Sequence, residues 1–133
     1  MEGSPVALVT GAAQGLGLAI SLRLRADGFD VVMGDVNAEG VRRAAGQVGG
    51  RGVTMDVSDD ASVAAAFDTL GDGPLDVLVN NAGLISRQPA AEFDSAQWDR
   101  EMAVNLGGTM RCSRAAYAHL VRAERLHLSL IHI

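Results

Sequence analysis

The chain has 133 residues, of which 48% are hydrophobic and 20% are charged, which is enough apolar material for one compact domain with its own core. Its net charge of −5 and pI near 5.0 lack the basic surface that nucleic acid or an anionic membrane attracts, so we expect neither as a partner and favour a small soluble molecule. No positively charged leader or long apolar run is present and Cys112 is the single cysteine, so we predict a cytoplasmic protein that neither is secreted nor spans a membrane.

The first predicted strand leads into a glycine-rich turn. Residues 6–9 are an apolar run without polar alternation, which is typical of a strand covered on both faces in a parallel sheet. Without a Cβ, Gly11 can adopt backbone angles closed to other residues, Gly15 lets a phosphate approach the main chain, and Gly17 lets a helix pack closely on its strand. The free N–H groups at the start of that helix then predict a pyrophosphate site.

The next elements alternate between helix and strand. Leu16, Ile20 and Leu24 recur at helical spacing and predict the packed face of a first helix, which Gly28 ends. Apolar runs bounded by cap-forming and glycine-rich segments follow. They predict strands at 29–34, 52–57 and 75–79, a helix from its cap at Asn37 to about Val48, and a helix between the cap formers at 58–60 and the break at 71–73.

This order of elements predicts the fold class. Strands that alternate with helices through short connections are typical of parallel βαβ units. We therefore expect an α/β, doubly wound parallel sheet of the Rossmann type, incomplete, with four strands in the order 3-2-1-4 and flanking helices. The loops that follow the strands would share one edge of this sheet, which is where a ligand would bind.

Two helices complete the predicted elements. After a loop at 84–93, Ser95 can cap a helix that carries Trp98. A second helix is expected from about Asn105 to Glu124. The residues expected to form one stripe along it are Leu106, Met110, Ser113, Tyr117 and Leu120.

Three motifs stand at the ends of predicted strands. They are TGAAQGLG at 10–17, Asp56-Val57 after the third strand and NNAG at 80–83. A glycine pattern alone also suits an ordinary tight turn, but the three motifs in this order resemble the short-chain dehydrogenase/reductase family. The resemblance implies an oxidoreductase that transfers a hydride between a nicotinamide cofactor and an alcohol or ketone.

The resemblance also implies roles for individual residues. Asp35 would accept hydrogen bonds from the adenosine ribose, and a carboxylate there repels the 2′-phosphate of NADP. Neither Gln14 nor Val36 supplies a cation for such a phosphate, so NAD is favoured; the alternative for Asp35 is a solvated turn residue. Asp56 and Val57 would lie against the adenine, and NNAG would form the floor beneath the cofactor. The expected cofactor-binding residues are Gly11, Gln14, Gly15, Leu16, Gly17, Asp35, Asp56, Val57, Asn80, Asn81, Ala82 and Gly83.

The catalytic residues of the family are only partly represented. Asn105 resembles the catalytic Asn that positions a water in a proton relay, although a helix cap explains an Asn there equally well. Family members also use a Ser and a Tyr-x-x-x-Lys pair, but this chain has no lysine, and Val121 stands four residues after its one tyrosine, Tyr117. We therefore expect Tyr117 to be a packing or interface residue and the chain to be unable to catalyse hydride transfer. His127 and His132 have no neighbouring Cys or carboxylate cluster, so no metal site is predicted.

The end of the sequence departs from the family pattern. Residues 128–133 (LSLIHI) match the translation of a common transposon-type sequencing adapter. We therefore expect residues 1–127 to be a partial NAD-binding domain and 128–133 to be a non-native tail, with the fourth strand left as an unpaired, association-prone edge. Two alternatives are a non-catalytic dinucleotide-binding module and, less favoured, a nucleotide-sugar epimerase or atypical reductase. The complete protein is expected to be a homo-oligomer.

Overall fold

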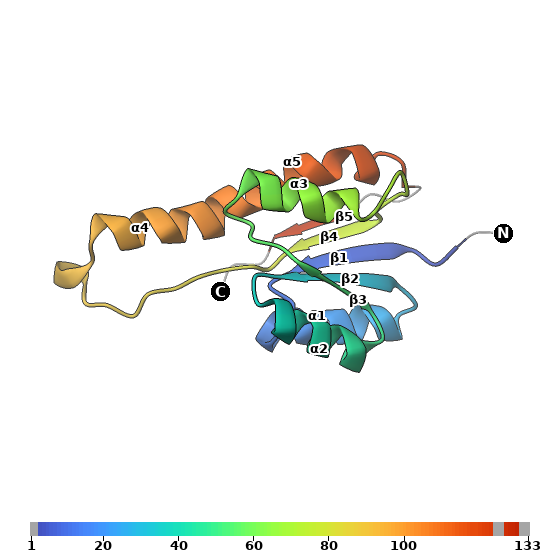
Figure 1. Cartoon of the computed structure of the whole chain (residues 1–133), viewed down its shortest axis with the longest axis horizontal. Coiled ribbons are helices and arrows are strands. Elements are labelled where there is room, and N and C mark those ends of the chain that lie inside the picture. The colour runs from blue at the N-terminus through green and yellow to red at the C-terminus, as the bar shows by residue number, and fades with distance from the viewer. Residues whose placement is uncertain (1–2, 124–126, 131–133) are drawn as a thin grey trace.

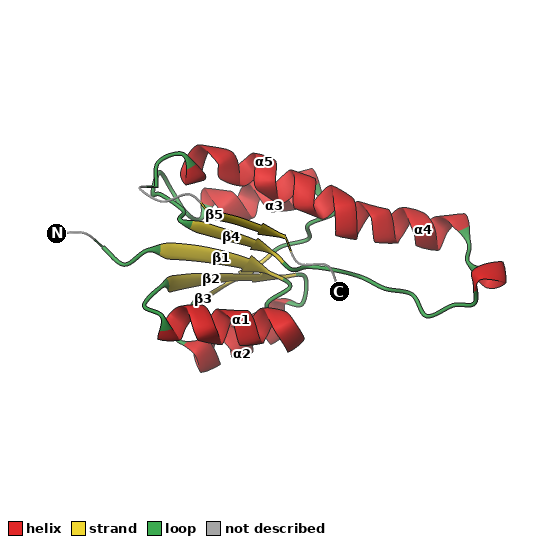
Figure 2. Ribbon diagram, turned by 180° about the vertical axis from the view of Figure 1, so that it is seen from behind, coloured by secondary structure: helices red, strands yellow, loops and turns green. Residues whose placement is uncertain are grey.

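A computed structural model describes residues 3–123 and 127–130 of the chain. Parallel strands form one sheet in the order β3-β2-β1-β4-β5, with α1 and α2 on one face and α3 and α5 on the other (Figures 1 and 2). The predicted α/β class and the strand order 3-2-1-4 are therefore confirmed. The strands are β1 (Val6–Thr10), β2 (Asp30–Asp35), β3 (Arg51–Thr54), β4 (Val77–Asn80) and β5 (His127–Leu130). The helices are α1 (Gly15–Ala26), α2 (Ala38–Val48), α3 (Asp60–Asp68), the 3₁₀ turn η1 (Ala90–Glu92), α4 (Ser95–Met102), the π turn η2 (Ala103–Gly107) and α5 (Gly108–Leu120).

The helix ends follow local capping chemistry. Asn37 accepts a hydrogen bond from the Gly40 amide at 3.0 Å and so caps α2, as predicted. The cap of α4 is Asp94, which accepts from the Gln97 amide at 2.7 Å, so the prediction of Ser95 as the cap was wrong by one residue. The Asp94 carboxylate is the side chain placed to reach the orphan donor three residues ahead.

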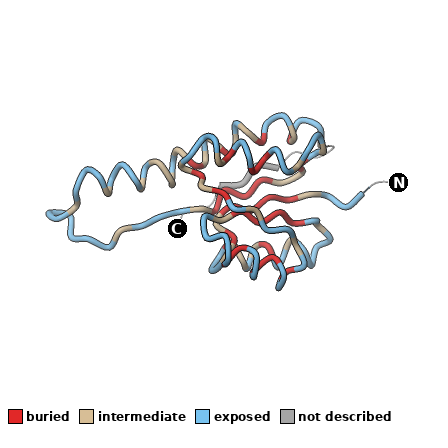
Figure 3. Tube along the Cα trace, viewed as in Figure 1, coloured by how far each residue is buried: buried red, intermediate tan, exposed pale blue. Residues whose placement is uncertain are grey.

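The core consists of two apolar clusters, one on each face of the sheet. Adjacent residues of β1 point to opposite faces, so Leu8 joins the cluster beneath α3 and α5, whereas Val9 joins the cluster beneath α1 and α2. This explains why β1 is apolar without alternation. Burial is concentrated in the strands and in the helix sides that face them, whereas α4 and the loop before it are largely exposed (Figure 3).

Helix α1 packs through small residues rather than through the predicted leucine stripe. Gly17 and Ser21 are its buried positions, and the Ser21 hydroxyl donates to the Gly17 carbonyl at 2.8 Å. Ile20 and Leu24 are half-buried, as the periodicity suggested, but Leu16 is 48% exposed. The prediction of Leu16 as a packed residue was therefore wrong, because this residue lines a cleft instead.

Helices α4 and α5 run into each other through η2, and α4 projects beyond the carboxyl ends of the strands (Figure 1). Asn105 lies inside this π turn and caps no helix end, so the alternative of a cap was wrong. Of the residues expected to form one stripe along α5, Leu120 is buried, whereas Tyr117 is 68% exposed. Glu124, the expected helix end, lies outside the described residues. The buried residues of α5 are Gly108, Cys112, Ala116 and Leu120.

Strand β4 is not an edge strand. Its backbone pairs in parallel with β5, with Val77 opposite His127 and Asn80 opposite Leu130. The expectation of an unpaired fourth strand was therefore wrong, because residues 127–130 supply backbone partners to the free side of β4. Residues 131–133, including His132, lie outside the described residues. Within the described part of the chain, no helix has the length and apolar character needed to cross a membrane.

Candidate functional site

A cleft of about 570 Å³ lies where the segments that follow β1, β2, β3 and β4 meet. This is the carboxyl edge of the parallel sheet, which is the expected place for a ligand in such a fold. Most of the predicted cofactor-binding residues line it together. These are Gly11, Gln14, Gly15, Leu16, Asp35, Asp56, Val57, Asn81, Ala82 and Gly83.

The glycine loop leaves open space at the start of α1. Gly11 and Gly15 have φ angles of 66° and 58°, which disfavour other residues. A Cβ on Gly11 would lie 2.8 Å from the Cα of Ala82, whereas a Cβ on Gly15 would meet nothing within 4 Å. No side chain caps α1, so the N–H groups at its start are left for a ligand in the cleft.

Gly17 does not line the cleft but supports it from behind. A Cβ at this position would overlap the Gly11 carbonyl oxygen and lie 2.6 Å from Nδ2 of Asn81. The predicted close packing therefore occurs against the glycine loop and the segment after β4. Because Gly17 has no side chain, α1 can pack closely against these two parts of the cleft.

Asp35 is fixed by backbone donors from both sides. Its Oδ2 accepts from the Ala13 amide and its Oδ1 from the Asn37 amide, each at 3.0 Å. The Ala12 amide also donates to the Gly34 carbonyl at 3.0 Å, which ties the glycine loop to β2. The carboxylate thus has one orientation at the rim of the cleft, with lone pairs remaining for further donors.

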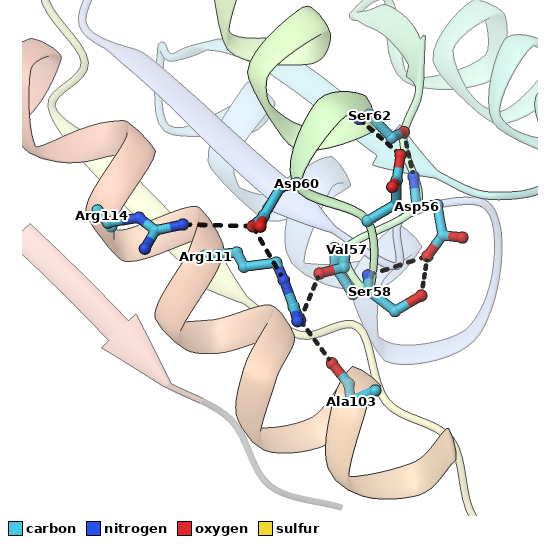
Figure 4. A network of polar contacts seen from close by, with 9 residues as sticks. Asp56, Val57, Ser58, Asp60, Ser62, Ala103, Arg111 and Arg114 are labelled. Atoms are coloured by element: carbon cyan, nitrogen blue, oxygen red, sulfur yellow. Dashed lines mark hydrogen bonds and ion pairs between the residues drawn. The ribbon is translucent and has the colours of Figure 1, made fainter. Parts of the chain in front are cut away.

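Asp56 is held in a similar way after β3. Its Oδ1 accepts from the amide and the hydroxyl of Ser58, at 2.9 and 2.6 Å (Figure 4). The Asp56 amide donates to Oγ of Ser62 at 2.9 Å. Because both bonds from Ser58 go to the same carboxylate oxygen, Oδ2 is the oxygen available to a ligand.

Thr10 joins β1 to the segment after β4, a role that the sequence motif did not reveal. Its buried hydroxyl accepts from the amides of Asn81 and Ala82, at 3.0 and 2.9 Å. The Asn81 side chain donates to the carbonyls of Thr10 and Gly11, each at 3.1 Å, and its amide oxygen finds no partner among the described residues. Asn80 lies outside the cleft lining and donates through Nδ2 to Oγ of Ser113 at 3.3 Å.

Asn105 lies beside the cleft and fixes its far wall. Its Oδ1 accepts from the Leu84 amide at 2.7 Å, and its Nδ2 donates to the Leu84 carbonyl at 2.8 Å. The Asn105 carbonyl accepts from the Thr109 hydroxyl at 3.2 Å. Its side chain is thus occupied with backbone, which leaves no free amide atom pointing to the cleft.

Several lining residues were not predicted. Val36, Met55 and Ser58 adjoin predicted residues in sequence, so a wider window around the motifs would have found them. Leu84 likewise follows the predicted Gly83, whereas Arg100, Ala103 and Val104 come from α4 and η2, which the three-dimensional arrangement brings to the cleft. The unpredicted lining residues are Val36, Met55, Ser58, Leu84, Arg100, Ala103 and Val104.

Cys112 is a buried thiol that lies outside the cleft lining. Burial raises the pKa of the Cys112 thiol to about 12, against a smaller lowering by Arg111. This cysteine is therefore protonated and inert at neutral pH. Residues 3–123 and 127–130 contain no cluster of three or more His, Cys, Asp or Glu side chains that could hold a metal ion.

Comparison with known proteins gives consistent matches. The family model for short chain dehydrogenase matches residues 5–127. The chain is 42% identical over 125 residues to D-threitol dehydrogenase of Mycolicibacterium smegmatis, covering 89% of this chain and 48% of that protein. It is also 42% identical over 125 residues to cis-4-hydroxycyclohexanecarboxylate dehydrogenase of Sinomonas cyclohexanicum, covering 89% of this chain and 50% of the relative.

A solved structure is also similar to this chain in fold and sequence. The 3-ketoacyl-(acyl-carrier-protein) reductase from Brucella melitensis, complexed with NADH, superposes with a TM-score of 0.85 at 34% identity. The match covers 90% of this chain and 52% of the reductase chain. The chain thus spans about half the length of the relatives it matches.

Proposed function

Because this chain belongs to the short-chain dehydrogenase family, we propose that it supplies the NAD-binding part of an oxidoreductase that transfers a hydride between nicotinamide and an alcohol or ketone. The observation that carries the proposal is the Asp35 carboxylate, fixed at the rim of a glycine-lined cleft. Two relatives are named as dehydrogenases and one solved neighbour holds NADH, which supports the same chemistry.

The cleft residues suit a dinucleotide. The glycine loop and the start of α1 offer N–H donors and space for a pyrophosphate, since even a Cβ on Gly15 would meet nothing. Asp35 would accept from the ribose hydroxyls, and Asp56 and Val57 would contact the adenine. When bound, NAD would supply the hydride acceptor. The remaining proposed contacts are Gln14, Leu16, Asn81, Ala82 and Gly83 in the lining, with Gly17 and Asn80 supporting the cleft.

We favour NAD over NADP on electrostatic grounds. A fixed carboxylate at residue 35 would repel a 2′-phosphate, and its neighbour in the lining, Val36, carries no charge. Arg100 is the one cation among the described lining residues, and it lies on α4 rather than on the segment after β2. The adenosine end of the cleft therefore suits free ribose hydroxyls.

We propose that this chain alone binds NAD without catalysing hydride transfer. It contains no lysine, so the Tyr-x-x-x-Lys pair of the family cannot form within it. Asn105 remains the proposed catalytic Asn of the complete site. Its two bonds to Leu84 would hold η2 in the complete site.

The projecting helix suits an interface between copies of the chain, and we propose that the complete protein is a homo-oligomer. Exposed apolar side chains recur at spacings of four or seven residues from α4 through η2 and α5 to Val121, which places them on one side of a helix. These residues are Trp98, Met102, Leu106, Met110, Tyr117 and Val121.

Titration of the purified chain with NADH and NADPH tests the cofactor proposal. We expect tighter binding of NADH, and we expect Asp35→Ala to weaken NADH binding about tenfold while leaving NADPH binding similar or stronger. Asp30→Ala is the matched control, since Asp30 lies at the other end of β2 and pairs with Arg25. Tighter NADPH binding by the unmodified chain would contradict the proposal.

A further inference from the structure

Arg111 of α5 connects parts of the cleft that lie far apart in sequence (Figure 4). Its Nε donates to Oδ1 of Asp60 at 3.1 Å. Its Nη1 donates to the carbonyls of Val57 and Ala103, at 3.4 and 3.1 Å. Val57 and Ala103 both line the cleft, one after β3 and the other as the first residue of η2. One guanidinium group therefore joins two walls of the cleft.

Two adjacent glycines make room for this arrangement. A Cβ on Gly107 would lie 2.6 Å from Nη1 of Arg111, and a Cβ on Gly108 would lie 2.6 Å from Cγ2 of Val57. The backbone at the end of η2 is therefore in direct contact with the guanidinium on one side and with the cleft wall on the other. A displacement of any one of these groups would disturb the other two.

Arg111 and its neighbour Arg114 share the Asp60 carboxylate but differ in exposure and in their other hydrogen bonds. The side chain of Arg111 is 21% exposed, whereas that of Arg114 is 65% exposed. Among the described residues, Arg114 donates only to Asp60, at 3.2 Å, in an exposed ion pair of a kind that adds little to stability. Nη1 of Arg111 instead donates charged hydrogen bonds to two backbone carbonyls, while Nε donates to Asp60.

The π turn held by Arg111 also carries Asn105. The side chain of Asn105 bonds the backbone amide and carbonyl of Leu84, a lining residue in the loop that follows β4. The chain of contacts thus runs from Val57 through Arg111 to η2, and from η2 through Asn105 to Leu84. Helical turns with π geometry have less regular backbone bonding, so side-chain support matters there.

We propose that Arg111 is a positioning residue: by binding the carbonyls of Val57 and Ala103 together, it holds η2, and with it the contact between Asn105 and Leu84, in register with the cleft wall. An effect of Arg111 on NAD binding rests on the proposed function. The position of Asn105 against Leu84 can be tested whether or not NAD binds.

Hydrogen exchange of the whole chain, followed by NMR, tests the positional role without any cofactor. The amide of Leu84 is protected by Asn105, and the amides of β1 report global unfolding. We expect Arg111→Ala to accelerate exchange at Leu84 about tenfold or more relative to β1, since charged donors are lost from the turn that carries Asn105. Arg114→Ala, which also removes a bond to Asp60, should leave Leu84 unchanged. Equal exchange at Leu84 in the two variants would overturn the proposal.

If Arg111→Ala does not fold, Arg111→Lys tests the positioning role of Arg111. Lysine retains a charge near Asp60, but its one nitrogen ends a bond short of the Nη1 position that donates to both carbonyls. We expect β1 protection as in the unmodified chain together with several-fold faster exchange at Leu84. Unchanged exchange at Leu84 in a folded Arg111→Lys protein would show that a donor at the Nη1 position is not needed and would refute the role.

NADH titration of the same proteins separates this role from the proposed function. We expect Arg111→Ala to weaken NADH binding about fivefold and Arg114→Ala to leave it unchanged, because only Arg111 holds Val57. An unmodified chain that does not bind NADH would contradict the proposed function, while exchange at Leu84 would still decide the role of Arg111. NADH binding that is equal in both variants would contradict the link between Arg111 and the cleft.

Discussion

At the scale of single residues, the cleft is built by short polar side chains that bind backbone atoms. Asp35, Asp56 and Thr10 each accept backbone N–H groups from a segment that follows a strand. Such bonds fix the acceptor as well as the segment that donates to it. The geometry of the site is therefore set before a ligand arrives, which lowers the entropic cost of binding.

Thr10→Val tests this view at one buried hydroxyl. Valine keeps the shape but removes the acceptor, so the Ala82 amide loses its partner and the Asn81 amide keeps only the Val79 carbonyl, at 3.1 Å. We expect a loss of about 1–3 kcal/mol in the free energy of unfolding, measured with urea. Thr69→Val, which removes a hydroxyl bonded only to a helical carbonyl, should cost well under half as much. Equal losses would contradict the role of Thr10.

Cys112 gives a prediction for alkaline pH. Burial raises its pKa from 9.0 to about 12, so the folded state retains a proton that the unfolded state releases. The sign follows from linkage: this contribution to stability is complete below pH 9 and is lost as the pH rises toward 12, at up to about 1.4 kcal/mol per pH unit. Because the chain has no lysine and one tyrosine, few other groups titrate there. Urea melts from about pH 8 to about pH 11 measure the free energy of unfolding over this range. It should fall more steeply with pH for the unmodified chain than for Cys112→Ala. Identical slopes would refute the assignment.

At the scale of elements, strand positions and most helix starts followed from the sequence because caps and apolar runs act locally. Asn37 and the β1 run are examples, and so is the fixed end of α2 at Gly49, whose φ is 77°. The α4 to α5 region did not follow, because a π turn has no local signature in the sequence. Its residues and the adjoining Gly108 contact Leu84 and Val57, which are distant in the chain.

Which residues of a helix are buried was also only partly predictable from the sequence. The residues predicted as one stripe of α5 differ in burial, since Leu120 is buried but Tyr117 is 68% exposed. Helical spacing also predicted Leu16 on the packed face of α1, but it is 48% exposed, and the close contact of α1 is made at Gly17. A glycine that permits close approach carries no hydrophobic signal. The motif residues, by contrast, meet in one cleft as predicted, since parallel strands bring their carboxyl ends together.

A pair of glycine substitutions tests the account of α1. Gly17→Ala places a Cβ against the Gly11 carbonyl and Asn81, so we expect lower stability and weaker NADH binding. Gly46→Ala in α2 places a Cβ where nothing lies within 4 Å, and we expect about 1 kcal/mol of added stability with unchanged binding. Thermal melts and NADH titrations of both proteins provide the measurements. A Gly17→Ala protein as stable as Gly46→Ala would contradict the packing described here.

At the scale of the whole molecule, the described chain is a five-stranded sheet with a cleft at one edge and a projecting helix. Pairing of β5 with β4 covers the edge that sequence reasoning had left open. That result was not predictable, since residues 127–130 carry no strand signal beyond a short apolar pattern. The cleft itself uses only segments that follow β1 to β4 and the α4 to η2 region.

The central claim is that this chain binds NAD specifically without catalysing hydride transfer. The most direct test is the thermal melt of the purified 133-residue chain with NAD or NADP at equal concentration. We predict a cooperative transition that NAD shifts upward, consistent with stabilisation of about 2.7 kcal/mol at a hundred times the dissociation constant, and that NADP shifts less. A melt that NAD leaves unchanged, or that NADP shifts further than NAD, would contradict the claim.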